Sequence, residues 1–236
     1  MERFVDRDFT GAEFRECMLD NSRFVGVVMR GAEIDGLLGD LTVNGVAVMP
    51  FVEAELDRRH PVRVLIRSDD VSDLRTGWQQ LQDDWAATID RIRRSPGIER
   101  TSVGGEWSTL QTLRHLVFVH DSWFSRCCLG RTEPFTALAL TTDGMPEDAA
   151  PGVDRAADPT LEEVLAVRAR QTTLLTDWLA RCTAEELGRP APVPDDDVWP
   201  PYARGRTVVQ CLRTVLNEEF EHHNFAVRDL ATLDRA

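Results

Sequence analysis

The residues best suited to chemistry lie near the C-terminal end of this 236-residue chain, where residues 217–224 read Asn-Glu-Glu-Phe-Glu-His-His-Asn. On a helix, a carboxylate and an imidazole four positions apart share one face and can bind one metal ion together. Two registers have this spacing, Glu218 with His222 and Glu219 with His223. The segment therefore indicates part of a metal site, on one of two adjacent helix faces.

The hydrophobic pattern of the same segment favours the second register. At about 100° per residue, five apolar residues define the inward face of a helix: Val208, Leu212, Leu216, Ala226 and Leu230. Glu219 and His223 fall within about 20° of Leu212, at the centre of this face, whereas Glu218 and His222 lie at its edge. Buried polar groups need partners, and a metal ion or a mutual hydrogen bond would serve equally well.

A third ligand must come from another part of the chain, which holds three further histidines. His60 stands in Arg-Arg-His-Pro and is expected at the surface. His115 and His120 fall on one predicted helix about 140° apart. His120 shares its face with leucine, valine and phenylalanine, so we expect a core histidine with a hydrogen-bond partner. His115 shares a mixed face with Arg126, so we predict His115 as the ligand and Arg126 as a residue that binds a polar cofactor.

Helices must position these side chains, and the sequence predicts four of them. Apolar residues recur at helical spacing in four segments, at about residues 74–92, 108–124, 160–178 and 207–233. Capping-box sequences begin at Ser108 and Thr207. We therefore expect a mainly α fold, with a four-helix bundle over residues 71–236. Two loops, 133–157 and 188–205, are longer than a plain bundle needs and could cover a site.

The first part of the chain has a different pattern, with a period of five. Large apolar residues recur at Phe4, Phe9, Phe14, Leu19, Phe24, Met29 and Ile34. This period fits neither a helix nor a flat strand. It resembles a pentapeptide-repeat segment, which implies a short right-handed β-helix. Asn44-Gly45 then predicts a hairpin, so residues 1–50 are expected to form this segment and residues 51–70 a linker.

Composition excludes several classes of function. The chain has 27 basic residues, all arginine, against 40 acidic ones, a net charge of −13. Such a surface disfavours nucleic acid and anionic membranes as partners. Five cysteines, an odd number without C-x-x-C spacing, argue against a disulfide framework or a structural zinc site. We expect a cytoplasmic protein.

Trp107 followed by serine, His115 eight positions later, and Glu-x-x-x-His on the last helix together resemble the DinB-like superfamily. The resemblance covers about residues 70–236. It implies a four-helix bundle in which three side chains hold a divalent metal. His115, Glu219 and His223 stand at the ligand positions that this resemblance implies.

A ligand set of two histidines and one glutamate is similar to that of mycothiol-dependent maleylpyruvate isomerase and related thiol-dependent transferases. This implies a divalent metal, with zinc the first choice before nickel or manganese, and a low-molecular-weight thiol that attacks an electrophilic small molecule. The arginine-only composition favours mycothiol as the thiol, and the resemblance favours a homodimer. Three alternatives stay open: His222 in place of His223 as ligand, a thiol-dependent isomerase, and a non-enzymatic pentapeptide-repeat interaction protein.

Overall fold

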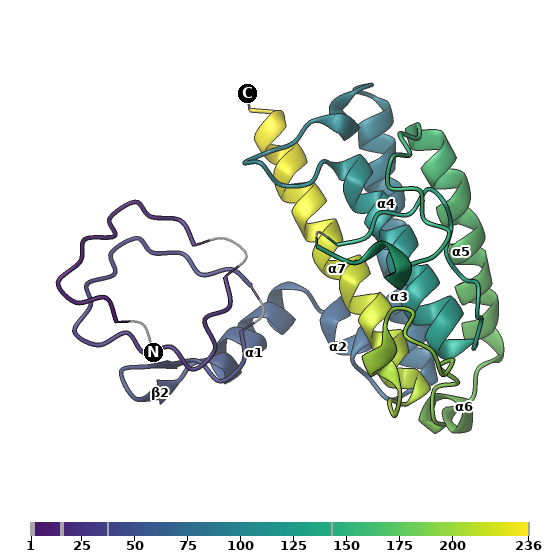
Figure 1. Cartoon of the computed structure of the whole chain (residues 1–236), viewed down its shortest axis with the longest axis horizontal. Coiled ribbons are helices and arrows are strands. Elements are labelled where there is room, and N and C mark those ends of the chain that lie inside the picture. Colours follow the sequence, from purple (N-terminus) through teal and green to yellow (C-terminus); the bar gives the residue numbers. More distant parts are fainter. Residues whose placement is uncertain (1–2, 15–16, 37, 143, 236) are drawn as a thin grey trace. The chain divides into compact units, whose positions relative to one another are not determined.

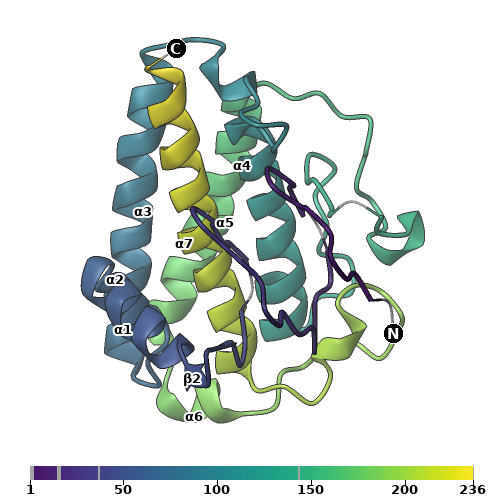
Figure 2. The same ribbon diagram turned by 90° about the vertical axis from the view of Figure 1, so that its left-hand side faces the viewer.

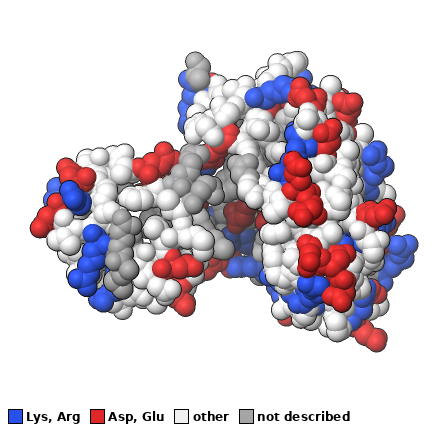
Figure 3. Space-filling view, viewed as in Figure 1, with Lys and Arg blue, Asp and Glu red and all other residues white. Residues whose placement is uncertain are grey.

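The computed structural model describes residues 3–14, 17–36, 38–142 and 144–235. The chain forms two compact units, Met1–Met49 and Pro50–Ala236, each of which is described by itself (Figure 1). In the described part of the chain, no helix is long and apolar enough to cross a membrane. Acidic side chains form several patches on the bundle face shown in Figure 3, among uncharged residues and arginines, and the chain has a net charge of −13.

The second unit confirms a mainly helical fold, with long helices packed side by side (Figures 1 and 2). The long helices are α3 (Val71–Arg93), α4 (Thr109–Val119) with its continuation η2 (His120–Cys128), α5 (Leu161–Arg181) and α7 (Val208–Leu233). The shorter ones are α1 (Met49–Arg59), α2 (Val62–Ile66) and α6 (Ala184–Gly188), with 3-10 turns η1 (Ile98–Arg100), η3 (Glu147–Ala149) and η4 (Pro201–Ala203). The residues between η2 and α5 and between α6 and α7 form the two long connections that the sequence predicts.

Capping residues mark the first residue of three of these helices. Ser108 accepts a hydrogen bond from the backbone N–H of Gln111, whose side chain in turn accepts from the N–H of Ser108. Thr160 and Thr207 start α5 and α7 with the same reciprocal pair. Each cap stabilises its helix by about 1 kcal/mol. The apolar stripe of α3 is then buried, including Trp78 and Trp85.

The segment η2 continues α4 in π-helical geometry over nine residues. A π-helix bonds i to i+5 and so has a wider turn than an α-helix. The rotation of 100° per residue therefore does not extend beyond His120. The angle between His115 and Arg126 therefore cannot be taken from this rule, and Arg126 is wholly buried with Asp196 as its partner.

Residues 51–70, expected as a linker, form helices instead. Val62 and Ile66 of α2 are buried. They pack closely on α3, where a Cβ added to Gly77 would lie 2.8 Å from Ile66 Cγ2. His60, expected at the surface, is half-buried, with its ring edge-on to Phe220 of α7 at 5.4 Å. The segment therefore belongs to the bundle rather than leading to it.

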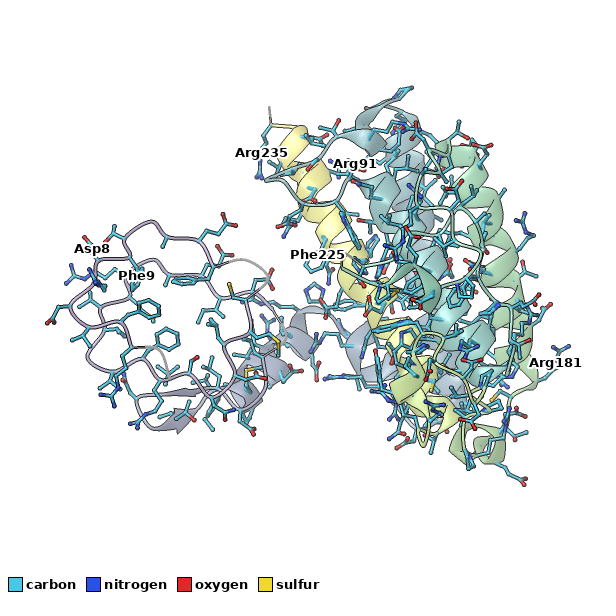
Figure 4. All side chains as sticks on the ribbon, viewed as in Figure 1. Asp8, Phe9, Arg91, Arg181, Phe225 and Arg235 are labelled. Carbon is cyan, nitrogen blue, oxygen red and sulfur yellow. The ribbon has the colours of Figure 1, made fainter. Side chains whose placement is uncertain are left out.

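The first unit repeats in its backbone with the period seen in its sequence. Positive φ angles recur at five-residue steps, at Asp6, Gly11, Asn21, Gly26 and Gly31. Phe9 points into the coil and Asp8 away from it (Figure 4), and the Phe9 ring lies edge-on to Phe4 and Phe14 at 5.6 and 5.9 Å. The predicted hairpin is present as β1 (Thr42–Val43) and β2 (Val46–Ala47). The described residues hold no other strand, so the expected β-helix is not shown.

Candidate metal centre

The structure brings one histidine of α4 together with a glutamate and a histidine of α7. The ligand atoms of His115, Glu218 and His222 all lie within 4.8 Å of one another. Nε2 of His222 is 3.1 Å from Oε2 of Glu218, and Nε2 of His115 is 3.8 Å from the same oxygen. The two helices pack against each other (Figure 2), so this group is held by the body of the bundle.

A long loop orients His115. Its Nδ1 lies 3.1 Å from the carbonyl oxygen of Leu140, in the connection between η2 and α5. A carbonyl oxygen only accepts hydrogen bonds, so Nδ1 carries the proton and Nε2 keeps a lone pair toward Glu218. The same loop is fixed to α4 through Arg114, whose Nε donates to the carbonyl of Leu138 at 2.9 Å. This second contact of a metal-binding histidine typically fixes its tautomer and ring orientation.

Glu218 is an ionised carboxylate at neutral pH. Partial burial acts to raise its pKa, but His115 and His222, which in their protonated forms donate hydrogen bonds to the carboxylate and carry positive charge, outweigh burial and hold the pKa at about 2. The His115 side chain is 7% exposed and that of Glu218 is 37% exposed. The group therefore sits at the edge of the bundle, with a buried nitrogen on one side and access to solvent on the other.

Aromatic rings surround the imidazoles. The indole of Trp107 lies 4.9 Å from the His115 ring and stacks on His222 at 6.4 Å, with an interplanar angle of 18°. Phe118 approaches His115 at 6.0 Å, and Phe225, labelled in Figure 4, approaches His222 at 5.8 Å. Rings of low polarity exclude water and strengthen electrostatic interactions within the group.

The structure does not bring Glu219 to His115. Glu219 is wholly buried, and the NH2 group of Arg168 donates to its two oxygens at 3.0 and 2.8 Å. Nε2 of His120 lies 2.8 Å from Oε1. Burial acts to raise the pKa of Glu219, but the charge of Arg168 and the hydrogen bond from His120 hold it at about 2. Glu219 therefore lies at the centre of the buried face of α7, as the hydrophobic stripe indicates, but its main partner is Arg168 of α5.

His223 is turned away from His115 as well. Its Nε2 lies 2.9 Å from Oγ1 of Thr88 and 3.2 Å from the carbonyl oxygen of Asp84, both on α3. Burial lowers its pKa. These two contacts hold Nε2 on α3, and His223 is not part of the group whose ligand atoms gather around His115. The four-residue spacing is thus present twice, and the Glu218–His222 pair is the one that faces His115.

Two further charged residues near these helices, Asp121 and Arg126, have buried side chains. Asp121 accepts hydrogen bonds from Nε2 of Gln171 at 2.8 Å and from the backbone N–H of Thr136 at 2.7 Å. Burial raises its pKa to about 6 against the effect of these hydrogen bonds. Arg126 is also wholly buried and donates to Asp196 in the loop before α7. It does not belong to the three-residue group.

Sequence reasoning missed Arg168 and the carbonyl of Leu140. The signal for Arg168 was present, since it stands in the apolar stripe of the third predicted helix between Val164 and Leu175. A buried cation requires a carboxylate, and Glu219 offers one. The carbonyl of Leu140 has no signature in the sequence, because any residue would supply it.

Comparison with known proteins identifies the bundle. The family model described as the DinB superfamily matches residues 49–226, which include α1 to α7 up to the last turns and all three residues of the candidate centre. No curated protein and no solved structure matches the chain. The match covers most of the chain and agrees with its helical fold, so the protein belongs to the DinB superfamily.

Proposed function

We propose that the protein is a metal-dependent transferase that uses a low-molecular-weight thiol, with mycothiol as the first choice, to attack an electrophilic small molecule. His115, Glu218 and His222 would hold the metal. The observation that carries the proposal is the orientation of His115: its Nδ1 is bound to the Leu140 carbonyl, and its Nε2 faces the Glu218 carboxylate and His222.

The donor set fits zinc. Two imidazole nitrogens and one carboxylate oxygen are typical of catalytic zinc sites, which leave a fourth position open. Ligands about 2.1 Å from a tetrahedral ion lie about 3.4 Å from one another. The separations of Glu218 from His222 and from His115, 3.1 and 3.8 Å, lie on either side of that value. Glu218 supplies one negative charge, and among the described residues no arginine forms an ion pair with it, which favours a divalent cation beside it.

The residues of the site would each have a distinct part in the reaction. When bound, a divalent metal lowers the pKa of a coordinated thiol and so maintains a thiolate near neutral pH. Leu140 keeps His115 in the required tautomer, and the ionised Glu218 offsets the positive charge of the ion. Trp107 and Phe225 limit water next to the imidazoles, which protects a nucleophilic sulfur from hydration. The partly exposed side of Glu218 leaves a path for the thiol.

Two experiments test this proposal. Elemental analysis of the purified protein should find about one zinc per chain, lost in His222→Ala and kept in the matched variant His223→Ala. Mass spectrometry should then detect a conjugate when the protein is incubated with a panel of thiols and a generic electrophile, and a chelator should abolish its formation. Zinc binding that survives His222→Ala, or conjugation that ignores the chelator, would contradict the proposal.

The isomerase alternative uses the same three residues and differs only in its products. An isomerase returns the thiol unchanged, so an isomeric product without a conjugate would favour it. Absence of both products in a protein that carries zinc would favour a binding role, with the five-residue repeat of the first unit as the interacting part.

A further inference from the structure

Arg126 is a buried cation whose donors are mostly unmatched. Its side chain is wholly buried, and only one of its terminal nitrogens finds an acceptor, the carboxylate of Asp196. Nε and NH1 have no hydrogen-bond partner among the described residues. A guanidinium keeps its charge and carries five N–H donors, and buried donors without acceptors are costly. An acceptor group from outside the chain would remove this cost.

Arg206 is a second cation in the same region. Its guanidinium lies over the rings of Trp123 and Tyr202, at 5.1 and 5.7 Å from their centroids. In the described part of the chain, no carboxylate forms an ion pair with it. Trp123 precedes Arg126 by three residues on η2 and lies edge-on to Tyr202 at 5.7 Å. Arg206 is thus stacked on Trp123, which stands one turn before Arg126 on η2, and Asp196, the partner of Arg126, lies in the loop that ends at Arg206.

This pair of arginines lies close to the candidate metal centre. Cys127, the neighbour of Arg126, lies in the same buried cluster as Cys211 of α7. Cys211 precedes Glu218 by seven residues, which is about 10 Å along a helix. Burial raises the pKa of Tyr202, Arg206 lowers it and Glu218 raises it, so the hydroxyl is within electrostatic range of both.

We propose that Arg126 and Arg206, with the rings of Trp123 and Tyr202, form an anion subsite that binds a carboxylate of the substrate. The inference rests on the proposed function, because it names the chemical class of the molecule handled at that centre. Asp196 shows that Arg126 pairs with a carboxylate at this position. Its side chain is 40% exposed, so a substrate carboxylate can replace it or bind beside it. On a chain with net charge −13, an anionic substrate needs such a local concentration of positive charge.

Fluorescence titration of the full-length, metal-free chain tests the subsite. The probe is succinate, a dicarboxylate, and its neutral analogue succinamide is the control ligand. Trp123 and Trp199 both lie within 6 Å of the Tyr202 ring and report binding. Succinate should change the fluorescence saturably, and succinamide should not.

Three substitutions make the test specific to this subsite. Arg206→Met should weaken succinate binding about tenfold, the value of one charge-assisted hydrogen bond. Because Arg206 is only half-buried, the Arg206→Met variant tests the subsite even if Arg126→Met fails to fold. Asp196→Asn should strengthen binding, because it removes the carboxylate that competes for Arg126. Arg170→Met, an exposed arginine of α5, is the matched control and should leave binding unchanged.

Equal binding of succinate and succinamide, or no binding of either, would overturn the inference. So would an affinity for succinate that neither Arg206→Met nor Asp196→Asn changes. Because the titration is done without metal, its result is separate from that of the proposed function. A chain that binds succinate but no zinc contradicts only the transferase proposal, whereas a chain that binds zinc and forms conjugates but ignores succinate contradicts only the subsite.

Discussion

Replacing Glu219 by glutamine should destabilise the bundle without removing the metal. Glu219 is wholly buried, and glutamine keeps its shape but leaves the charge of Arg168 unpaired. The pKa of Glu219 falls from 4.5 to about 2 on folding, and this difference corresponds to about 3 kcal/mol at 1.36 kcal/mol per unit. Removing one partner of a buried ion pair typically costs about 3–5 kcal/mol, which is consistent. For a bundle of this size, the melting temperature should fall by about 6–12 °C.

The measurement is urea unfolding of the metal-free protein as a function of pH. Because folding lowers the pKa of Glu219, its contribution is complete above pH 4.5 and is lost as the pH falls toward 2. The difference in unfolding free energy between the wild type and Glu219→Gln should therefore be largest at pH 7 and shrink at pH 3. Glu218→Gln is the matched control. Its side chain is 37% exposed, so its unfolding free energy should change by less than about 1 kcal/mol.

The two variants should differ in the opposite way in their zinc content. Glu218→Gln should lose zinc, and Glu219→Gln should keep about one zinc per folded chain. The reasoning is refuted if Glu219→Gln unfolds like the wild type and loses its zinc. That outcome would mean that the central glutamate binds the metal and that Arg168 is not its main partner.

Three further predictions concern the free energy of unfolding of the metal-free protein, measured in urea. Burial raises the pKa of Asp121 from 3.8 to about 6, so its contribution to the free energy of unfolding is complete below pH 3.8 and is lost as the pH rises through 6. Asp121→Asn should therefore remove about 2 kcal/mol of the decline in stability between pH 4 and pH 7. A pH profile that this variant leaves unchanged would contradict the prediction. Gly77→Ala should destabilise by about 1–3 kcal/mol, because the new Cβ meets Ile66 at 2.8 Å; a more stable variant would show that α2 is not packed so closely. Ser108→Ala should lose about 1 kcal/mol, Ser108→Asp should lose little, and equal losses would argue against the cap.

The bundle could be predicted because its determinants are local. Capping residues such as Ser108 and Thr207 mark helix starts, and the apolar stripe of α3 repeats at helical spacing over its whole length. Residues 51–70 escaped prediction because α1 buries none of its residues and so has no apolar stripe, whereas α2 is only five residues long and depends on α3 for its burial. The burial of Arg126 escaped prediction because it lies in a π-helical segment, whose turn is wider than the 100° per residue of an α-helix.

The candidate site was predicted in part, and the part that failed has a physical cause. The sequence indicates the correct two helices and a spacing of four residues, but two adjacent pairs have this spacing. The hydrophobic stripe measures burial, and it correctly finds that Glu219 is more buried than Glu218. Burial, however, is a poor guide to a ligand when the protein itself can supply the partner, as Arg168 and His120 do here.

A catalytic metal needs an open position that a substrate can reach, so its ligands belong at the boundary between the apolar and polar faces of a helix. A carboxylate at the centre of the apolar face must instead be neutralised from within, since no solvent reaches it. Adjacent residues on a helix point about 100° apart, so a doubled Glu-Glu and His-His sequence supplies both environments at once. In this chain Glu219 ties α7 to η2 and α5 in the core, and the same contacts hold Glu218 and His222 at the edge, where they face His115. A doubled motif of this kind therefore predicts two neighbouring roles, one structural and one available for binding, and the more exposed pair is the one to test for metal.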